Sequence, residues 1–358
     1  MGRPSLARSR GRVGLAWPCT MFRLPRELRG EITDLVRERF GVRVTFGVML
    51  CLILANLGTT AAQYAGVASS AELFGVSRYL AVPLAALGVW LLVTRGSYRH
   101  VERVLLVMSR YAVAQVVSAF MVHPPWGEVL HRALVPTFRL ETHYLLAVLA
   151  TIGTTITPWA AVYTQASVAD KGVRIAEFTN TRLDVALGAV TGNVVSGFFI
   201  IATAATLFAH GIRVETAEQA ALALAPVFGP WAELLFGLGL LGASLLTASV
   251  LPLATTCAVC EVFGWERGLD HRPKEALIFY RLYTALVVLI PGLRLFPLMW
   301  LSHVANAVLL PVVLVLMLRL ANEQTIMHQW RSGRISNVLT IVLTISVSLT
   351  MLALLMDS

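Results

Sequence analysis

The residues most able to do chemistry in this apolar chain lie in the stretch GTTITPWAAVYTQ, residues 153–165. Pro158 has no backbone N–H, and its ring collides with the carbonyl four residues earlier, that of Thr154. The four residues before the proline are all β-branched and are therefore weak helix formers as a group. The stretch predicts a helix that kinks or opens at Pro158.

An opened helix has a chemical meaning if it lies inside a membrane. Residues 143–167 form an apolar segment of about 37 Å as a helix, long enough to cross a bilayer. Carbonyls freed in hydrocarbon are costly unless they line a cavity or bind an ion, and interrupted helices form the ion sites of many transporters. The alternative is an ordinary proline kink whose carbonyls are satisfied by the neighbouring Thr hydroxyls.

The composition indicates a membrane protein. The chain has 358 residues, of which 57% are hydrophobic and 14% charged, and its mean hydropathy is +0.72. Apolar runs of roughly 18 to 25 residues recur along it, and each can cross about 30 Å of hydrocarbon. We therefore predict an all-α membrane protein with about nine spans, at residues 44–66, 78–94, 102–122, 143–167, 184–209, 229–260, 276–291, 296–318 and 335–356.

The distribution of charge predicts the topology. Most of the 29 Lys and Arg residues fall before the first span or in alternate connections, which places those segments in the cytoplasm. The prediction is a basic cytoplasmic arm at residues 1–43, a transmembrane domain at residues 44–358, and a C-terminus outside the cytoplasmic (inner) membrane. The net charge of +9 follows from this orientation and gives no reason to expect a nucleic-acid partner.

Several stretches, in order, resemble the NRAMP family of divalent metal transporters. The sixth helix of that family reads approximately G-A-T-V-M-P-H, and residues 153–159 read GTTITPW. ANLGTTAAQYAGVASSAELFG resembles the third helix and LSHVANAVLLP the tenth. The resemblance implies an inverted-repeat transporter fold with a broken sixth helix, in which the nine spans are helices three to eleven.

The resemblance also implies a site for a divalent cation, which is a substrate and not a cofactor. Thr154 matches the position whose carbonyl faces the ion, Thr157 replaces a methionine, and His303 replaces a glutamine. Because a thioether selects soft metals, its loss at Thr157 favours hard cations, Mg²⁺ or Mn²⁺. The alternative for His303 is a packed helix residue without a ligand role.

Positions where the family carries proton-handling residues are occupied here by side chains that do not titrate, namely Asn56, Gln63, Gly66, Trp159 and Thr164. Proton-coupled transport needs groups that change charge within the membrane. The pattern therefore predicts uncoupled transport and is similar to the NRAMP-related magnesium-transporter branch. A proton-coupled Mn²⁺ or Fe²⁺ transporter is the alternative.

The D-P-G-N motif of the family's first helix and most of the second helix have no counterpart here, and no Asp or Glu lies well inside a predicted span. A dication at the membrane midplane needs a compensating carboxylate. We expect an N-terminally truncated chain, whose partner is a missing N-terminal segment or a second polypeptide. Two alternative interpretations remain, an inactive fragment and a carrier of organic solutes. An enzymatic function has no support, because no nucleophile and base stand together in the sequence.

Small residues predict close helix packing at two places, Gly188 with Gly192 and Gly197, and Gly237 with Gly239 and Gly242.

Overall fold

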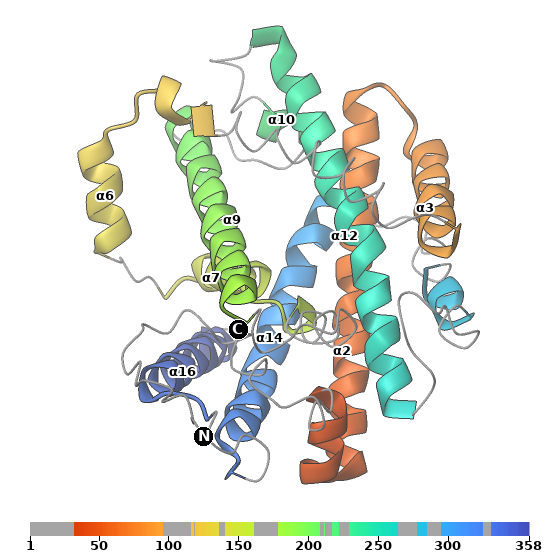
Figure 1. Cartoon of the computed structure of the whole chain (residues 1–358). Coiled ribbons are helices and arrows are strands. Elements are labelled where there is room, and N and C mark those ends of the chain that lie inside the picture. The colour runs from red at the N-terminus through yellow and green to blue at the C-terminus, as the bar shows by residue number, and fades with distance from the viewer. Residues whose placement is uncertain are drawn as a thin grey trace, which may run out of the picture.

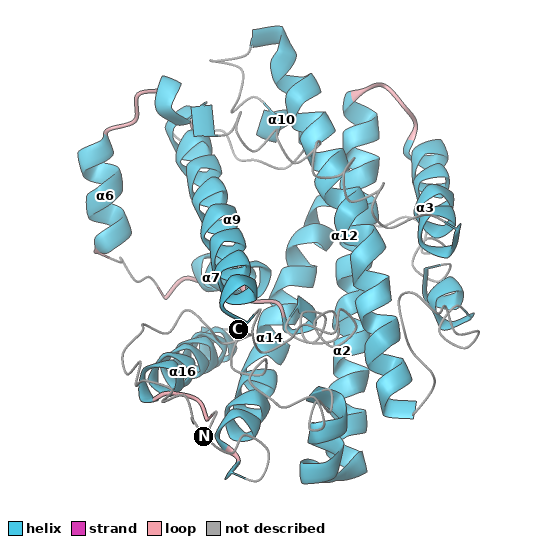
Figure 2. Ribbon diagram, in the orientation of Figure 1, coloured by secondary structure: helices cyan, strands magenta, loops and turns pink. Residues whose placement is uncertain are grey.

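The computed structural model describes residues 32–95, 116–117, 119–135, 140–160, 178–207, 211, 217–221, 229–263, 278–284, 295–324 and 331–357. Throughout these residues the regular structure is helical and no strand occurs (Figure 2), as the sequence predicts. The elements in chain order are α2 (Ile32–Leu73), α3 (Arg78–Arg95), α6 (Trp126–Leu134), α7 (Thr142–Thr155), α9 (Phe178–Thr206), α10 (Ala217–Ala221), η5 (Gly229–Trp231), α12 (Ala232–Phe263), α14 (Leu295–Asn322) and α16 (Arg334–Asp357).

Five helices of the described part are long and apolar enough to cross a membrane. They coincide with five predicted spans, and their apolar segments are Arg39–Leu73, Leu183–Thr206, Ala232–Cys260, Leu301–Asn322 and Arg334–Met356. Helix α3 contains the predicted span 78–94, but its apolar segment, Arg78–Leu91, is shorter than those of the five helices. Three predicted spans lie partly outside the described residues, namely 102–122, 143–167 and 276–291. Residues 1–31 lie wholly outside them. The chain is thus a multi-pass helical membrane protein.

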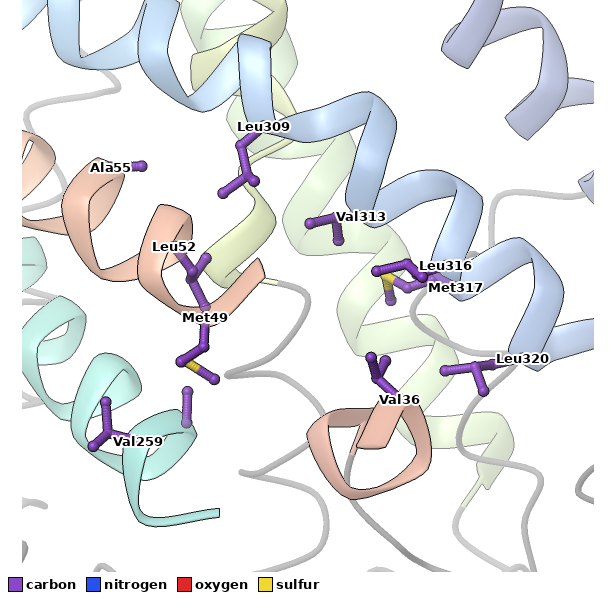
Figure 3. Packing of buried hydrophobic residues seen from close by; sticks show 11 residues of the cluster. Val36, Met49, Leu52, Ala55, Val259, Leu309, Val313, Leu316, Met317 and Leu320 are labelled. Carbon is purple, nitrogen blue, oxygen red and sulfur yellow. The ribbon is translucent and has the colours of Figure 1, made fainter. Parts of the chain in front are cut away.

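The centre of the molecule is formed by α2, which packs against both α12 and α14 (Figure 1). Of the apolar segment of α14, 61% is buried inside the protein, whereas for α9 the share is 6%. Helix α14 is therefore a core helix, whereas α9 is mostly exposed in the described part of the chain. Figure 3 shows one apolar cluster that joins the three central helices, made by Val36, Met49, Leu52, Ala55, Ala258, Val259, Leu309, Val313, Leu316, Met317 and Leu320.

Helix α2 begins before the predicted span and changes direction at Gly41. The backbone of Gly41 has φ 82° and ψ 166°, a conformation that glycine alone adopts without strain. The bend carries the preceding turn of helix back against the bundle. Val36 is buried there, Arg39 forms an ion pair with Glu323 at 3.3 Å, and Arg37 donates to the Val262 carbonyl at 3.4 Å. This segment therefore packs on the ends of α12 and α14.

The other end of α2 lies seven residues beyond the predicted end of the span, at Leu73. Gly75, with φ 71°, donates to the Glu72 carbonyl, and Val76 donates to the Ala71 carbonyl. This pair of bonds is the Schellman arrangement that ends a helix on a glycine. Because only four residues separate α2 from α3, the two helices form an antiparallel pair, and Arg78 bonds Glu72 across the turn.

The glycine pattern predicts packing correctly at one place and wrongly at the other. A Cβ at Gly237 would lie 2.6 Å from the ring of Phe74, so α12 and the end of α2 approach closely there. At Gly188, Gly192 and Gly197 a Cβ would meet no described atom within 4 Å. These three glycines lie on α9, which is largely exposed, and they make no close helix contact within the described part of the chain.

We predict that Gly41→Ala destabilises the protein by about 1–3 kcal/mol, because alanine is strained at this backbone conformation although its Cβ would meet no neighbour. Gly47→Ala is the matched control, since Gly47 lies on the same helix, has helical backbone and also has no neighbour within 4 Å. The control is expected to keep or slightly raise stability. Thermal unfolding in detergent measures both, and equal midpoints for the two variants would contradict the strain at Gly41.

Candidate functional site

The predicted break is present in α7. The helix ends at Thr155, and the next residue, Ile156, has φ −123° and ψ 84°. A helical turn resumes at Pro158, and the Ala160 N–H donates to the Thr157 carbonyl at 3.1 Å. Thr155 and Thr151 donate their hydroxyls to carbonyls one turn earlier. The prediction that β-branched residues before Pro158 interrupt this helix is confirmed.

The turn before the break is pressed against α14. A Cβ at Gly153 would lie 2.0 Å from the carbonyl oxygen of His303 and 2.9 Å from the backbone nitrogen of Ala307. Only glycine permits this contact of backbone with backbone. Because Thr154 follows Gly153 directly, the break in α7 and His303 lie at the same level of the bundle.

The three predicted site residues differ in their surroundings. Thr154 is exposed, whereas Thr157 and His303 are half-buried. The Nδ1 atom of His303 is buried and has no hydrogen-bond partner among the described residues. The structure thus places His303 beside the break, and the role of the three residues in ion binding stays a prediction.

A layer of buried polar side chains crosses the bundle near this level, and it starts from Asn56 on α2. Asn56 is 1% exposed, and its amide donates to the Thr255 hydroxyl of α12 at 2.8 Å. Thr255 in turn donates to the Leu251 carbonyl. The amide oxygen of Asn56 accepts no hydrogen bond from any described group. Helices α2 and α12 are therefore joined by a bond between two neutral side chains.

The next turn of α2 makes two more bonds of this kind. The Asn306 amide of α14 donates to the Thr59 hydroxyl at 2.7 Å, and the hydroxyls of Thr60 and Tyr283 share a hydrogen bond of 3.1 Å. Sequence reasoning identified Asn56 but missed Thr59, Thr60 and Asn306. The available signal was polar residues at spacings of three and four in an apolar span, which place them on one face of the helix.

Gly66, six residues after Thr60 on α2, is enclosed by α12. A Cβ there would lie 2.2 Å from the Ser244 hydroxyl oxygen and 3.3 Å from its Cβ. In this packing position 66 has no room for a carboxylate side chain. Gln63 is half-buried, Trp159 packs against the central apolar cluster, and Thr164 lies outside the described residues.

Among the described residues, no group of three or more His, Cys, Asp or Glu is placed to hold a metal ion. The guanidinium carbon of Arg281 lies 5.5 Å from the ring centroid of Trp90 on α3, a cation–π distance.

An interrupted helix packed against a buried span, inside a bundle of membrane-crossing helices, is an architecture typical of transporters. Residues 21–357 match the sequence model of one family, described as natural resistance-associated macrophage protein-like (Nramp). The chain belongs to the Nramp family.

Two relatives are both named divalent metal cation transporter MntH, in agreement with the expectation that this chain is not an enzyme. The protein of Clostridium acetobutylicum is 24% identical over 221 residues, which cover 60% of this chain and 50% of the relative. That of Erwinia tasmaniensis is 28% identical over 234 residues, which cover 63% and 56%. The matched region thus spans about half the length of these relatives.

The fold is similar to that of a solved transporter structure. The crystal structure of the Eremococcus coleocola manganese transporter, in complex with an aromatic bis-isothiourea substituted compound, superposes with a TM-score of 0.67. It is 19% identical, and the match covers 93% of this chain and 76% of that chain. The likeness supports the transporter fold predicted from the sequence.

We predict that Gly153→Ala destabilises the bundle by about 1–3 kcal/mol, because the new methyl group forces α7 and α14 apart. Gly188→Ala is the control, since the added Cβ meets no described atom within 4 Å. Unfolding midpoints in detergent compare the two variants. A Gly153→Ala protein as stable as the control would show that α7 does not touch α14 at this residue.

Proposed function

We propose that this chain transports divalent metal cations, Mg²⁺ or Mn²⁺ or both, across the cytoplasmic membrane without coupling to protons. The observation that carries the proposal is the interrupted α7, whose last helical turn lies against α14 at His303. An interrupted helix presents backbone oxygens that a helix otherwise uses internally, and oxygen is the ligand that hard cations prefer. The names of the MntH relatives support the same class of substrate.

The preference for hard cations follows from the side chains at the break. Thr154 and Thr157 offer hydroxyl and carbonyl oxygens, and neither offers sulfur. His303, beside the break, adds a nitrogen that suits Mn²⁺ as a direct ligand or Mg²⁺ through a bound water. Together these donors form the oxygen-rich half of a cation site.

The absence of proton coupling is inferred from the neutral polar layer. Asn56 bonds Thr255, Thr59 bonds Asn306 and Thr60 bonds Tyr283, so no carboxyl group takes part in these bonds. Position 66 is too enclosed for a carboxylate side chain. Neutral amides and hydroxyls change no charge between pH 5 and 8. A proton moving with the ion would need another route.

The donors at the break supply no negative charge, and a dication in a low-dielectric site needs one. We propose that a carboxylate from a preceding segment or a second polypeptide completes the site. We further propose that the N-terminal side lies in the cytoplasm, as the distribution of Lys and Arg indicates.

A transport assay tests the substrate and the coupling separately. The chain is reconstituted, together with the preceding segment or second polypeptide that supplies the carboxylate, into liposomes that contain a Mn²⁺ or Mg²⁺ indicator and, in parallel, a pH-sensitive dye. We expect cation entry with an unchanged lumenal pH. Acidification that depends on the metal would favour the proton-coupled alternative, metal-independent uptake of an organic solute would favour an organic-solute carrier, and no uptake would favour an inactive fragment.

Thr157→Met tests the predicted ligand directly. A thioether at this position should raise the ratio of Cd²⁺ to Mg²⁺ uptake severalfold, because sulfur binds soft ions and binds Mg²⁺ poorly. Thr151→Met is the matched control, since Thr151 lies on the same helix before the break and is exposed. An equal ratio in both variants would remove Thr157 from the site.

A further inference from the structure

The side chain of Asn306 on α14 is oriented by two hydrogen bonds. Its amide nitrogen donates to the Thr59 hydroxyl at 2.7 Å and to the Ser302 carbonyl at 3.0 Å. The Thr59 hydroxyl gives its own hydrogen to the Ala55 carbonyl at 2.9 Å, so toward Asn306 its oxygen can only accept. The nitrogen of the Asn306 amide must therefore face Thr59, and the amide oxygen points away from both partners.

That oxygen is a buried acceptor without a donor. Asn306 is 0% exposed, and its Oδ1 atom accepts no hydrogen bond from any described group. An unpaired polar atom in a protein interior is costly, and a bound ion or water is a common reason for one in a native structure. Because both amide hydrogens are already engaged, only the oxygen is available to a ligand.

The break in α7 passes the level of Asn306. Before the break, Gly153 meets the backbone of α14 at His303, one turn earlier than Asn306. After the break, Trp159 packs against the central apolar cluster, whose members on α14 all follow Asn306 in the sequence. Residues 154–158 therefore cross from one side of this level to the other, along the helix against which α7 packs.

We propose that the Oδ1 atom of Asn306 is a ligand of the transported cation, next to His303 and the oxygens of the break. The inference rests on the proposed function and adds a residue to its site. A carbonyl oxygen suits Mg²⁺ and Mn²⁺. His303 also holds a buried atom, Nδ1, without a partner among the described residues, so α14 carries two such atoms one turn apart. Thr59 is then a positioning residue that orients the amide.

Two alanine variants separate a ligand from an amide that only joins helices. Asn306→Ala and Thr59→Ala each remove the hydrogen bond between α2 and α14, but only the first removes the oxygen. Mn²⁺ affinity is measured by electron paramagnetic resonance, from the signal of free Mn²⁺, on the preparation used for transport. We expect Asn306→Ala to weaken binding by about tenfold or more, a loss typical of metal sites, and Thr59→Ala to weaken it severalfold less.

Asn306→Asp tests the same oxygen in the chain alone. The new carboxylate supplies negative charge at position 306, so Mn²⁺ is expected to bind about tenfold or more tightly than to the unchanged chain, because ligand charge sets the affinity of such sites. Asn56→Asp is the matched control, since Asn56 is 1% exposed in the same layer but bonds Thr255 on α12. It is expected to gain no Mn²⁺ binding.

The outcomes distinguish this inference from the proposed function. Equal losses in Asn306→Ala and Thr59→Ala, or no gain in Asn306→Asp, would show that Asn306 only joins α2 to α14. An equal gain in Asn56→Asp would show that any buried carboxylate of the layer attracts Mn²⁺, and would also overturn the assignment. Absence of Mn²⁺ binding by the unchanged protein would contradict the proposed function itself, and this inference with it. If one variant loses cooperative unfolding, the other pair decides.

Discussion

The structure depends on the requirement that polar groups inside a membrane find partners within the protein. Helix α2 carries Asn56, Thr59 and Thr60 in the middle of an apolar span, where lipid offers them no hydrogen bond. Each side chain bonds a different element: α12 through Thr255, α14 through Asn306, and the helical segment 278–284 through Tyr283. This condition fixes the rotation and depth of α2 more sharply than apolar packing does, because apolar contacts are not directional.

The same bonds also hold the break in α7 in place. Asn306 fixes α14 to α2, and His303 lies one turn earlier on α14, where its carbonyl meets Gly153. A sequence of contacts therefore runs from α2 through α14 to the interrupted turn. Backbone packing at Gly153 holds the break against a buried helix, so that Thr154 and Thr157 have a defined place in the bundle instead of the freedom of a loop.

The sequence predicted the elements well because their causes are local. Pro158 follows four β-branched residues and interrupts α7, whereas Pro252 and Pro311 follow Leu-containing turns and lie inside continuous helices. The contacts between elements were not predictable in this way. Asn56 and Thr255 are 199 positions apart, Thr59 and Asn306 are 247 apart, and no local pattern selects such partners. The same limit explains the error at Gly188 and Gly192, where small residues have no described helix beside them.

The neutral polar layer also links the stability of the fold to its proposed mechanism. A charged group at Asn56 would be buried at 1% exposure and would need a partner of opposite charge, which neither Thr255 nor Leu251 provides. The neutral amide avoids that cost and still joins two helices, at a net gain of about 0.5–1.5 kcal/mol. The amide and hydroxyl bonds of Asn56, Thr59 and Asn306 therefore do not change with pH between 5 and 8.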